Sequence, residues 1–234
     1  MRIRHGYRHR PKFIEPALSQ PGIDNIRNII ARFLSIVWIP LLILVLPVIV
    51  YWNVLHSGFH SDDFFYHAQF TYTLSQFIEK IALIHEGYLN YPFFRPVTIM
   101  SFRLDHLIYG DDAVGFHFTN LLLHSINGLL VFTLMGRLGF NRIVSFVSAI
   151  IFGIYPIHSE AVVWISGRLD VLSFTFVLVS LILWCEGRLR DDARWLLAST
   201  AVYLVAIFSK EVAASQILLM PLIDWLIHLD TRRN

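Results

Sequence analysis

The chain has 234 residues, of which 56% are hydrophobic and only 15% carry a charge. Soluble domains carry about 25% charged residues, so this composition excludes an ordinary soluble enzyme and indicates a polytopic helical membrane protein. The net charge of +2 gives no electrostatic support for a nucleic-acid partner. Cys185 is the single cysteine, which excludes an intrachain disulfide framework and a cysteine-based metal cluster.

The chain begins with a basic segment, residues 1–32, in which three prolines interrupt helical continuity. We expect a cytoplasmic tail that contacts anionic lipid head groups. The first long apolar run follows, and it predicts a membrane span over 33–51. This run is too long, and starts too far from the N-terminus, for a typical cleaved signal peptide, so we expect it to stay as an anchor.

A long polar and aromatic loop is predicted over 53–115, on the outer side of the membrane. It contains two stretches, 64–84 and 98–109, whose apolar residues recur at helical spacing. Both stretches suit helices that lie in the membrane interface.

Five further spans are predicted after the loop, so the expected fold is all-α with about six spans in one membrane domain, 33–230, and no repeat domain. The five segments are 116–135, 143–158, 169–185, 195–209 and 212–229. With the N-terminus cytoplasmic, 14 of the 19 Lys and Arg residues lie on the inner side and 5 on the outer side. The excess of basic residues in cytoplasmic segments supports this orientation.

Two adjacent carboxylates, Asp62 and Asp63, follow the first span and lie close to the membrane surface. Removing a carboxylate from water is unfavourable, so paired acids at this place suggest catalysis. One acid could be a general base and the other its orienting partner, or the two could hold a metal ion. In the structural alternative, Ser61 or Asp62 caps the helix that follows.

Three cations on the same outer face, Arg95, Arg168 and Lys210, are candidates for holding a phosphate group. In the alternative they form ion pairs with neighbouring carboxylates, and the sequence leaves both interpretations open. The supporting polar residues expected nearby, which include those carboxylates and possible ligands of a divalent metal, are His158, Glu160, Asp170 and Glu211. The partners weighed for the cations are Asp170 or Glu160 for Arg168, and Glu211 for Lys210.

These residues belong to a series of motifs with a recognisable order. The motifs are His60-x-Asp62-Asp63, Phe94-Arg95-Pro96, Phe116-His117-x-x-Asn120, His158-Ser159-Glu160-Ala161, Gly167-Arg168-Leu169-Asp170 and Ser209-Lys210-Glu211. The order resembles the N-terminal membrane part of the transmembrane-and-tetratricopeptide-repeat (TMTC-like) protein O-mannosyltransferases, in the GT-C glycosyltransferase superfamily. The resemblance covers about residues 50–225.

The resemblance implies a transferase that moves a sugar, mannose or another hexose, from a polyprenyl- or dolichyl-phosphate carrier to a hydroxyl acceptor. The expected acceptor is Ser or Thr of a protein, and the family's acidic motif corresponds to Asp62-Asp63. The protein is then expected in the inner membrane of a bacterium or the endoplasmic reticulum of a eukaryote. The alternatives are a non-catalytic membrane subunit, a lipid-binding scaffold or a fragment of a larger transferase, and a second membrane subunit is a possible partner.

Overall fold

The computed structural model describes residues 21–70, 75, 76, 78, 79 and 94–231, and every regular element in this part of the chain is a helix. The prediction of an all-α fold is therefore confirmed. The chain divides into two units, Met1–Trp38 and Ile39–Asn234. In the first unit the described residues form the start of α1 (Pro21–Val50), and most of the predicted tail lies outside the described residues.

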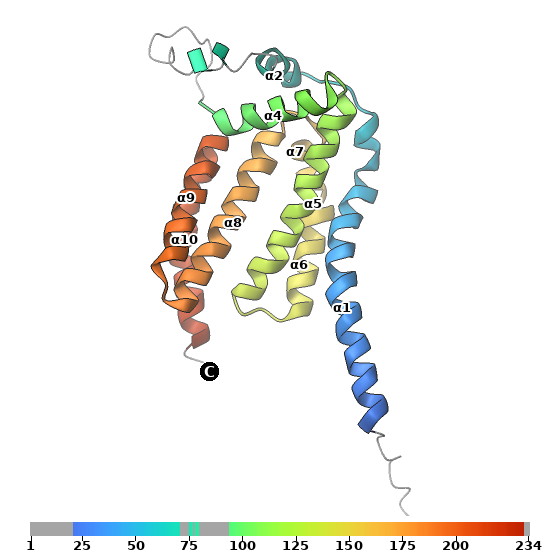
Figure 1. The fold of residues 1–234 in the computed structure, drawn as a ribbon, viewed down its shortest axis with the longest axis vertical. Coiled ribbons are helices and arrows are strands. Elements are labelled where there is room, and N and C mark those ends of the chain that lie inside the picture. The colour runs from blue at the N-terminus through green and yellow to red at the C-terminus, as the bar shows by residue number, and fades with distance from the viewer. Residues whose placement is uncertain (1–20, 71–74, 77, 80–93, 232–234) are drawn as a thin grey trace, which may run out of the picture. The chain divides into compact units, whose positions relative to one another are not determined.

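The second unit contains the rest of α1 and a bundle of helices (Figure 1). Its further elements are η1 (Trp52–His56), α2 (Asp62–Phe70), α4 (Pro96–Tyr109), α5 (Ala113–Arg137), α6 (Arg142–Ile154), η3 (Pro156–His158), α7 (Ser159–Val163), α8 (Arg168–Arg190), α9 (Ala193–Ser209), η4 (Glu211–Ser215) and α10 (Gln216–Thr231).

Two of the described helices, α5 and α8, are long and apolar enough to cross a membrane. The pair formed by α6 and residues 156–163, bent by 46°, gives a third candidate span. Each of the six predicted segments coincides with a helix, but their lengths establish two or three candidate spans, and six spans stay a prediction. Within the predicted segment 143–158 the helix itself ends at Ile154, and the bend of the third candidate span follows there. Tyr155 precedes a proline and is extended, with ψ of 128°.

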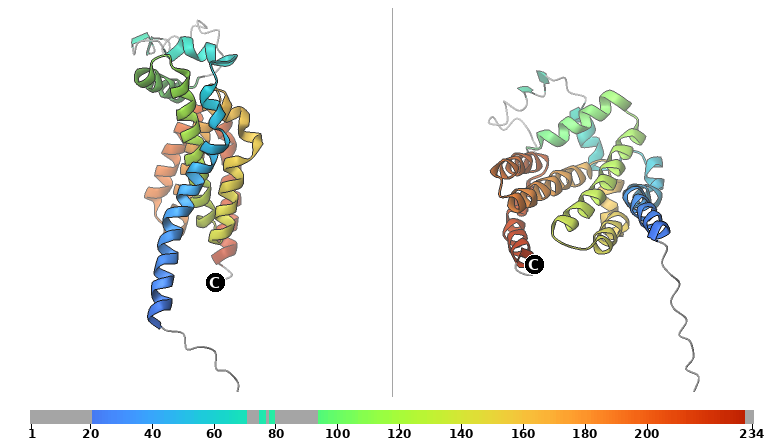
Figure 2. Two further views of the ribbon diagram at one scale, coloured as in Figure 1. Left: turned by 90° about the vertical axis from the view of Figure 1, so that its right-hand side faces the viewer. Right: turned by 60° about the horizontal axis from the view of Figure 1, so that its bottom comes forward.

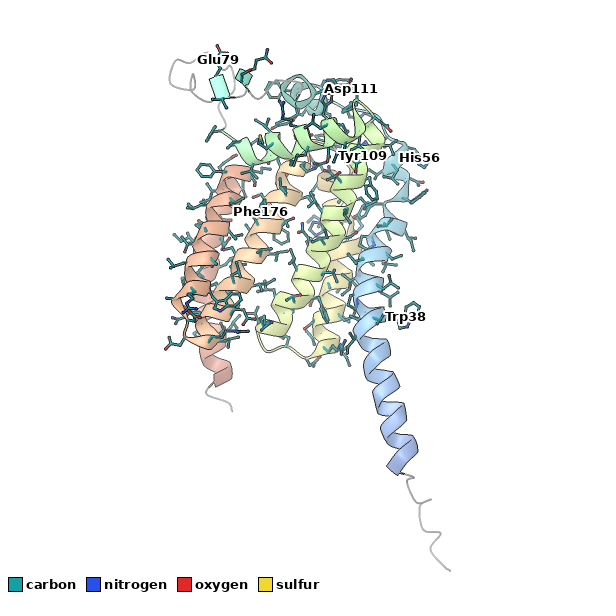
Figure 3. All side chains as sticks on the ribbon, viewed as in Figure 1. Trp38, His56, Glu79, Tyr109, Asp111 and Phe176 are labelled. Atoms are coloured by element: carbon teal, nitrogen blue, oxygen red, sulfur yellow. The ribbon has the colours of Figure 1, made fainter. Side chains whose placement is uncertain are left out.

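Helix α4 lies across one end of the bundle, where it packs against α2, α5 and α9 (Figures 1 and 2). Tyr109 and Asp111 mark this end in Figure 3, and Phe176 lies along α8. The predicted interfacial stretch 98–109 falls within α4. The stretch 64–84 is described only in part, as α2 and residues 75, 76, 78 and 79, and the remainder lies outside the described residues. Placement of either stretch in the membrane interface stays a prediction.

Helix α8 packs between α5 and α9, and small residues permit close contact elsewhere in the bundle. A Cβ atom at Gly153 would lie 2.8 Å from Cγ of Pro47, so only glycine fits where α6 crosses the second half of α1. Such close contacts between helix backbones are typical of membrane bundles. The packing leaves the polar ends of α5, α8 and α9 beneath α4 and α2.

Candidate functional site

The connection between α6 and α8, residues 155–167, forms one wall of the site. The side-chain amide of Asn120 holds it from α5, donating to the carbonyl oxygens of Trp164 at 2.9 Å and Ile165 at 3.2 Å. At Gly167 a Cβ atom would lie 2.3 Å from the carbonyl oxygen of Ala161, so the turn into α8 requires glycine. The connection is therefore anchored to the bundle by buried hydrogen bonds.

Asp63 joins this connection to the start of α2. Its carboxylate is 0% exposed and accepts hydrogen bonds from the backbone N–H groups of Ser166, at 2.7 Å, and His60, at 2.9 Å. The hydrogen bond with His60 joins residues three apart in the sequence. The structural alternative also expected a local hydrogen bond at the start of this helix, but from the side chain of Ser61 or Asp62. Because both oxygens of Asp63 accept from the backbone, this residue positions its neighbours.

Asp62, in contrast, is exposed and faces a pocket of 560 Å³, here called the acid pocket. Its carboxylate lies 3.4 Å from the Ser61 hydroxyl, which donates to it. The acid pocket is lined by Asp62, Tyr66, Arg95, Ile157, Glu160, Ala161, Trp164, Ser166, Gly167, Leu169, Asp170 and Lys210. Of the two predicted catalytic acids, only Asp62 is among these lining residues.

Arg95 lines the acid pocket from the N-terminus of α4 and is held in two directions. Its guanidinium donates to both carboxylate oxygens of Glu211, at 2.5 and 2.9 Å, and to the Tyr66 hydroxyl at 3.2 Å. The hydrogen bond from Arg95 holds the pKa of Glu211 below its ordinary value. Glu211 is half exposed, whereas Arg95 is buried, so the carboxylate is the partner of this pair that reaches the solvent.

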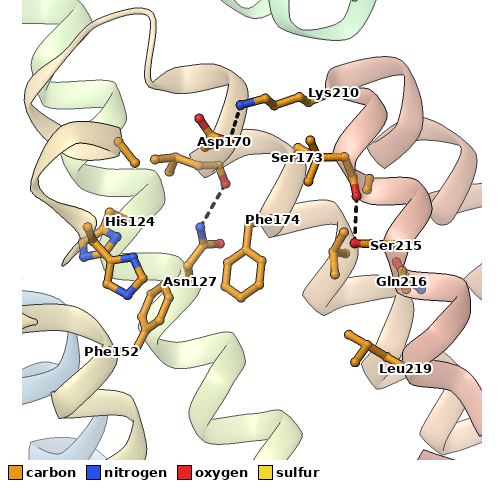
Figure 4. Close-up of a pocket in the computed structure, with 16 residues that line it drawn as sticks. His124, Asn127, Phe152, Asp170, Ser173, Phe174, Lys210, Ser215, Gln216 and Leu219 are labelled. Atoms are coloured by element: carbon orange, nitrogen blue, oxygen red, sulfur yellow. Dashed lines mark hydrogen bonds and ion pairs between the residues drawn. The ribbon is translucent and has the colours of Figure 1, made fainter. Parts of the chain in front are cut away.

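Lys210 lies on the border between the acid pocket and a second pocket of 310 Å³, here called the aromatic pocket (Figure 4). Its ammonium group contacts the carboxylate of Asp170 at 2.5 Å, and both residues line both pockets. The partner weighed from the sequence, Glu211, instead binds Arg95. A single ligand with its anionic group at Lys210 can therefore extend into either pocket.

The aromatic pocket lies among α5, α6, α8 and α10, and eight of its sixteen lining residues are polar. The ring of His158 packs 4.6 Å from that of Phe152, so the predicted His158 and Glu160 pair is divided between the two pockets. The lining residues are His124, Asn127, Phe152, His158, Ala161, Asp170, Val171, Ser173, Phe174, Val177, Lys210, Val212, Ala213, Ser215, Gln216 and Leu219.

Arg168 lines neither pocket, so the structure does not bring it together with Arg95 and Lys210, and its role as a phosphate ligand stays a prediction. Its side chain is 0% exposed and donates to Asp105 at 2.6 Å and to the carbonyl oxygen of Phe116 at 2.9 Å. It also donates to the side-chain oxygen of Asn120. The expected partners Asp170 and Glu160 are not involved, because the first turn of α8 directs Arg168 under α4, towards Asp105. In this arrangement the charge of Arg168 is paired with Asp105 in the interior.

Sequence reasoning missed several polar residues that the fold brings to the site. Asp105 was placed on the outer face without a role, and Asn127 and Gln216 are polar residues within apolar helices, which was the available signal. Among the described residues, no group of three His, Cys, Asp or Glu side chains is arranged to hold a metal ion. The candidate site is thus a carboxylate pocket and an aromatic pocket that share one lysine.

Comparison with known proteins places the chain among mannosyltransferases. It is 31% identical over 130 residues to the protein O-mannosyl-transferase Tmtc1 of Drosophila melanogaster, an alignment that covers 56% of this chain and 15% of that protein. It is 32% identical over 134 residues to human protein O-mannosyl-transferase TMTC4, covering 51% of this chain and 18% of that protein. The chain thus spans less than a fifth of the length of these relatives. No solved structure matches the chain.

The family profile described as dolichyl-phosphate-mannose-protein mannosyltransferase matches residues 95–234. The match includes Arg95, Glu160, Asp170 and Lys210, whereas Asp62 precedes it. It covers more than half of the 234 residues. The chain therefore belongs to the dolichyl-phosphate-mannose-protein mannosyltransferase family.

Proposed function

We propose that this chain is the donor-binding and catalytic membrane part of a glycosyltransferase that moves mannose, or another hexose, from a dolichyl or polyprenyl phosphate to a hydroxyl group. The proposed acceptor is Ser or Thr of a protein. The observation that carries the proposal is that one pocket is lined by an exposed carboxylate, Asp62, and by two cations, Arg95 and Lys210. Family membership and the names of the relatives support the same chemistry.

Asp62 is the proposed general base. The acceptor oxygen bonds to the anomeric carbon, and the bond from that carbon to the phosphate oxygen breaks. The phosphate leaves with the electron pair, while Asp62 takes the hydroxyl proton. A single displacement of this kind inverts the anomeric centre, whereas a nucleophilic carboxylate that formed a covalent intermediate would retain it. The leaving phosphate is already a stable anion, so the reaction needs no strong general acid.

Lys210 and Arg95 are the proposed phosphate ligands. Both cations are neutralised by carboxylates that are half exposed, Asp170 and Glu211. A lipid phosphate that enters the pocket replaces these carboxylates with a diester that carries one negative charge, and arginine binds phosphate oxygens in a bidentate manner. As the phosphate leaves the sugar its charge rises, so the same two cations stabilise the transition state more than the bound donor. Glu160, another carboxylate that lines the pocket, is proposed to orient the acceptor.

Six membrane spans with a cytoplasmic N-terminus are part of the proposal, because this topology puts the acid pocket on the outer or lumenal face. The 14-to-5 distribution of Lys and Arg supports it. A cysteine introduced at Gly58, in a Cys185→Ala background, should react with an impermeant thiol reagent added from outside. One introduced at Arg190 should not react. The opposite labelling would contradict the proposed orientation.

The decisive experiment measures donor binding and sugar transfer by the purified chain in lipid nanodiscs, with a lipid-phosphate mannose and a Ser/Thr-containing peptide. We expect saturable donor binding and labelled peptide. A chain that does not bind the lipid phosphate would overturn the proposal.

A second candidate function is a non-catalytic donor-binding part that works with a further membrane segment or subunit. The alignments cover 15% and 18% of the two relatives, so the activity of the whole relatives remains a proposal for this chain. The same experiment separates the two, because this candidate predicts donor binding without transfer by the chain alone. Transfer would then require the further membrane segment or subunit to be added.

A further inference from the structure

Two residues that line the aromatic pocket each have a buried side-chain oxygen with no hydrogen-bond partner in the part of the chain that the structure describes. Asn127 and Gln216 are each 1% exposed. Their amide nitrogens are occupied, since Nδ2 of Asn127 donates to the carbonyl oxygen of Val171 at 2.9 Å and Nε2 of Gln216 donates to the Ser180 hydroxyl at 2.8 Å. Oδ1 of Asn127 and Oε1 of Gln216 accept nothing. Buried polar atoms are almost always paired, so both oxygens indicate a ligand that donates hydrogen bonds.

An aromatic surface accompanies these acceptors in the same pocket. The rings of Phe152 and Phe174 stack with centroids 5.5 Å apart and an interplanar angle of 26°. In the view of Figure 4, Phe174 lies between Asn127 and Gln216, which come from different helices. A ligand that fits has an apolar face for the rings and hydrogen-bond donors around its edge.

A hexose ring has these properties, because its C–H groups form an apolar face and its hydroxyl groups lie around the edge. The pocket volume of 310 Å³ is at the lower end of small-molecule sites, about 300–1,000 Å³, and suits one sugar ring. A polyprenyl chain is longer and has no hydrogen-bond donor, so it would leave both oxygens unpaired. A hydroxyl group of the ligand would supply the hydrogen bond that each oxygen lacks.

We propose that the aromatic pocket holds the hexose ring of the lipid-phosphate donor, with its hydroxyl groups donating to Asn127 and Gln216. Lys210 lines both pockets, so a phosphate held there leaves the anomeric carbon at the border with the acid pocket. The inference rests on the proposed function and adds the sugar-recognition residues to it. Neither residue is part of the predicted site.

The test uses three ligands with the same lipid phosphate and the unmodified chain in lipid nanodiscs. The ligands are the free carrier phosphate, its mannosyl ester and its cyclohexyl ester, which has a ring without hydroxyl groups. Two hydroxyl-to-amide hydrogen bonds should make the mannosyl ester bind about 5- to 100-fold more tightly than the cyclohexyl ester. Equal affinity for the two esters would overturn this inference and leave the phosphate site intact. If none of the three binds, the proposed function and this inference are both overturned.

Variants identify the residues responsible. Gln216→Met and Asn127→Leu should each reduce the preference for the mannosyl ester about two- to tenfold, while the free carrier phosphate binds as before and reports a folded site. Ser180→Ala is the matched control, because it removes the partner of the Gln216 nitrogen but leaves Oε1 in the pocket. An equal loss of preference in Ser180→Ala and Gln216→Met would overturn the assignment to Gln216. If a variant does not fold, the comparison of ligands on the unmodified chain decides.

Discussion

Charged residues at the α4 end of the bundle form two groups whose surroundings differ. Asp62 and Lys210 face the acid pocket, whereas Asp63 and Arg168 are 0% exposed beneath it. The pocket-facing residues have exposed or half-exposed partners that a ligand can replace. The buried residues instead bind backbone groups and Asp105 in the interior. Residues of one type that are adjacent in sequence can thus have opposite roles, one in ligand chemistry and the other in holding the site together.

The largest expected effect concerns the pocket-facing acid. Asp62→Asn keeps the size of the side chain but removes its basicity, so turnover should fall about 10²- to 10⁴-fold with donor binding and the melting temperature unchanged. Transfer of a radiolabelled sugar to the acceptor measures this turnover. Glu160→Gln is the control in the same pocket and should lose less. Near-normal turnover in Asp62→Asn would remove Asp62 as the base.

Arg168 tests the buried side of the comparison. Arg168→Met leaves Asp105 charged and buried without its partner, which should lower the free energy of unfolding by about 3–5 kcal/mol. Denaturant unfolding in detergent measures it. The double variant Arg168→Met/Asp105→Leu should recover much of this loss, because an apolar pair replaces a buried ion pair with little penalty. A stable Arg168→Met variant with weakened phosphate binding would return Arg168 to the list of phosphate ligands.

Lys210 is expected to affect donor binding, whereas Arg168 is expected to affect the free energy of unfolding. Lys210→Gln removes a charged hydrogen bond to the donor phosphate, so donor affinity should fall about 10- to 100-fold. Equilibrium binding of the lipid phosphate in nanodiscs measures it. Asp170→Asn is the informative control, because it removes the competing carboxylate and should tighten phosphate binding. If Asp170→Asn weakens binding, Asp170 supports the donor and does not compete with it.

Asp63 should behave as the buried counterpart of Asp62. Asp63→Asn retains one oxygen but leaves one of two backbone N–H groups facing an amide nitrogen, so stability should fall by about 1–3 kcal/mol. Thermal unfolding measures this loss. Turnover at a temperature where the variant is folded should fall less than in Asp62→Asn. A larger loss of turnover in Asp63→Asn would exchange the roles of the two acids.

The smallest expected effect is a pH dependence from the Arg95–Glu211 pair. The pKa of Glu211 is lowered in the folded chain by the hydrogen bond from Arg95, so the pair stabilises the fold above the ordinary Glu pKa of 4.5. This contribution is lost as the pH falls through the lowered folded-state value. Melting temperatures from pH 7 to pH 3 should therefore decline less steeply in Glu211→Gln than in the unmodified chain. Parallel curves would show that the pair contributes nothing measurable.

The helical class and the approximate positions of the long apolar helices followed from the sequence alone, because long apolar runs have few alternatives to a helix in a membrane. The sequence also identified the acid pair, the three cations and the family, through motifs that are short and local. The break after Ile154 was foreseeable from Pro156, although the predicted segment continued to residue 158. Neither the length nor the hydropathy of the runs establishes six spans.

The hydrogen-bond partners of the site residues are visible only in the folded structure. Asp105 and Arg168 are 63 residues apart, and Asp63 reaches Ser166 across 103 residues, so no local pattern could report either contact. Asp62 and Asp63 are neighbours in the sequence, yet successive residues of a helix point in different directions, and only Asp62 lines the acid pocket. The unpaired oxygens of Asn127 and Gln216 likewise became visible only once the helices around them were packed. Which groups remain open to a ligand depends on burial and on hydrogen bonds between distant segments, and both arise only when the chain is folded.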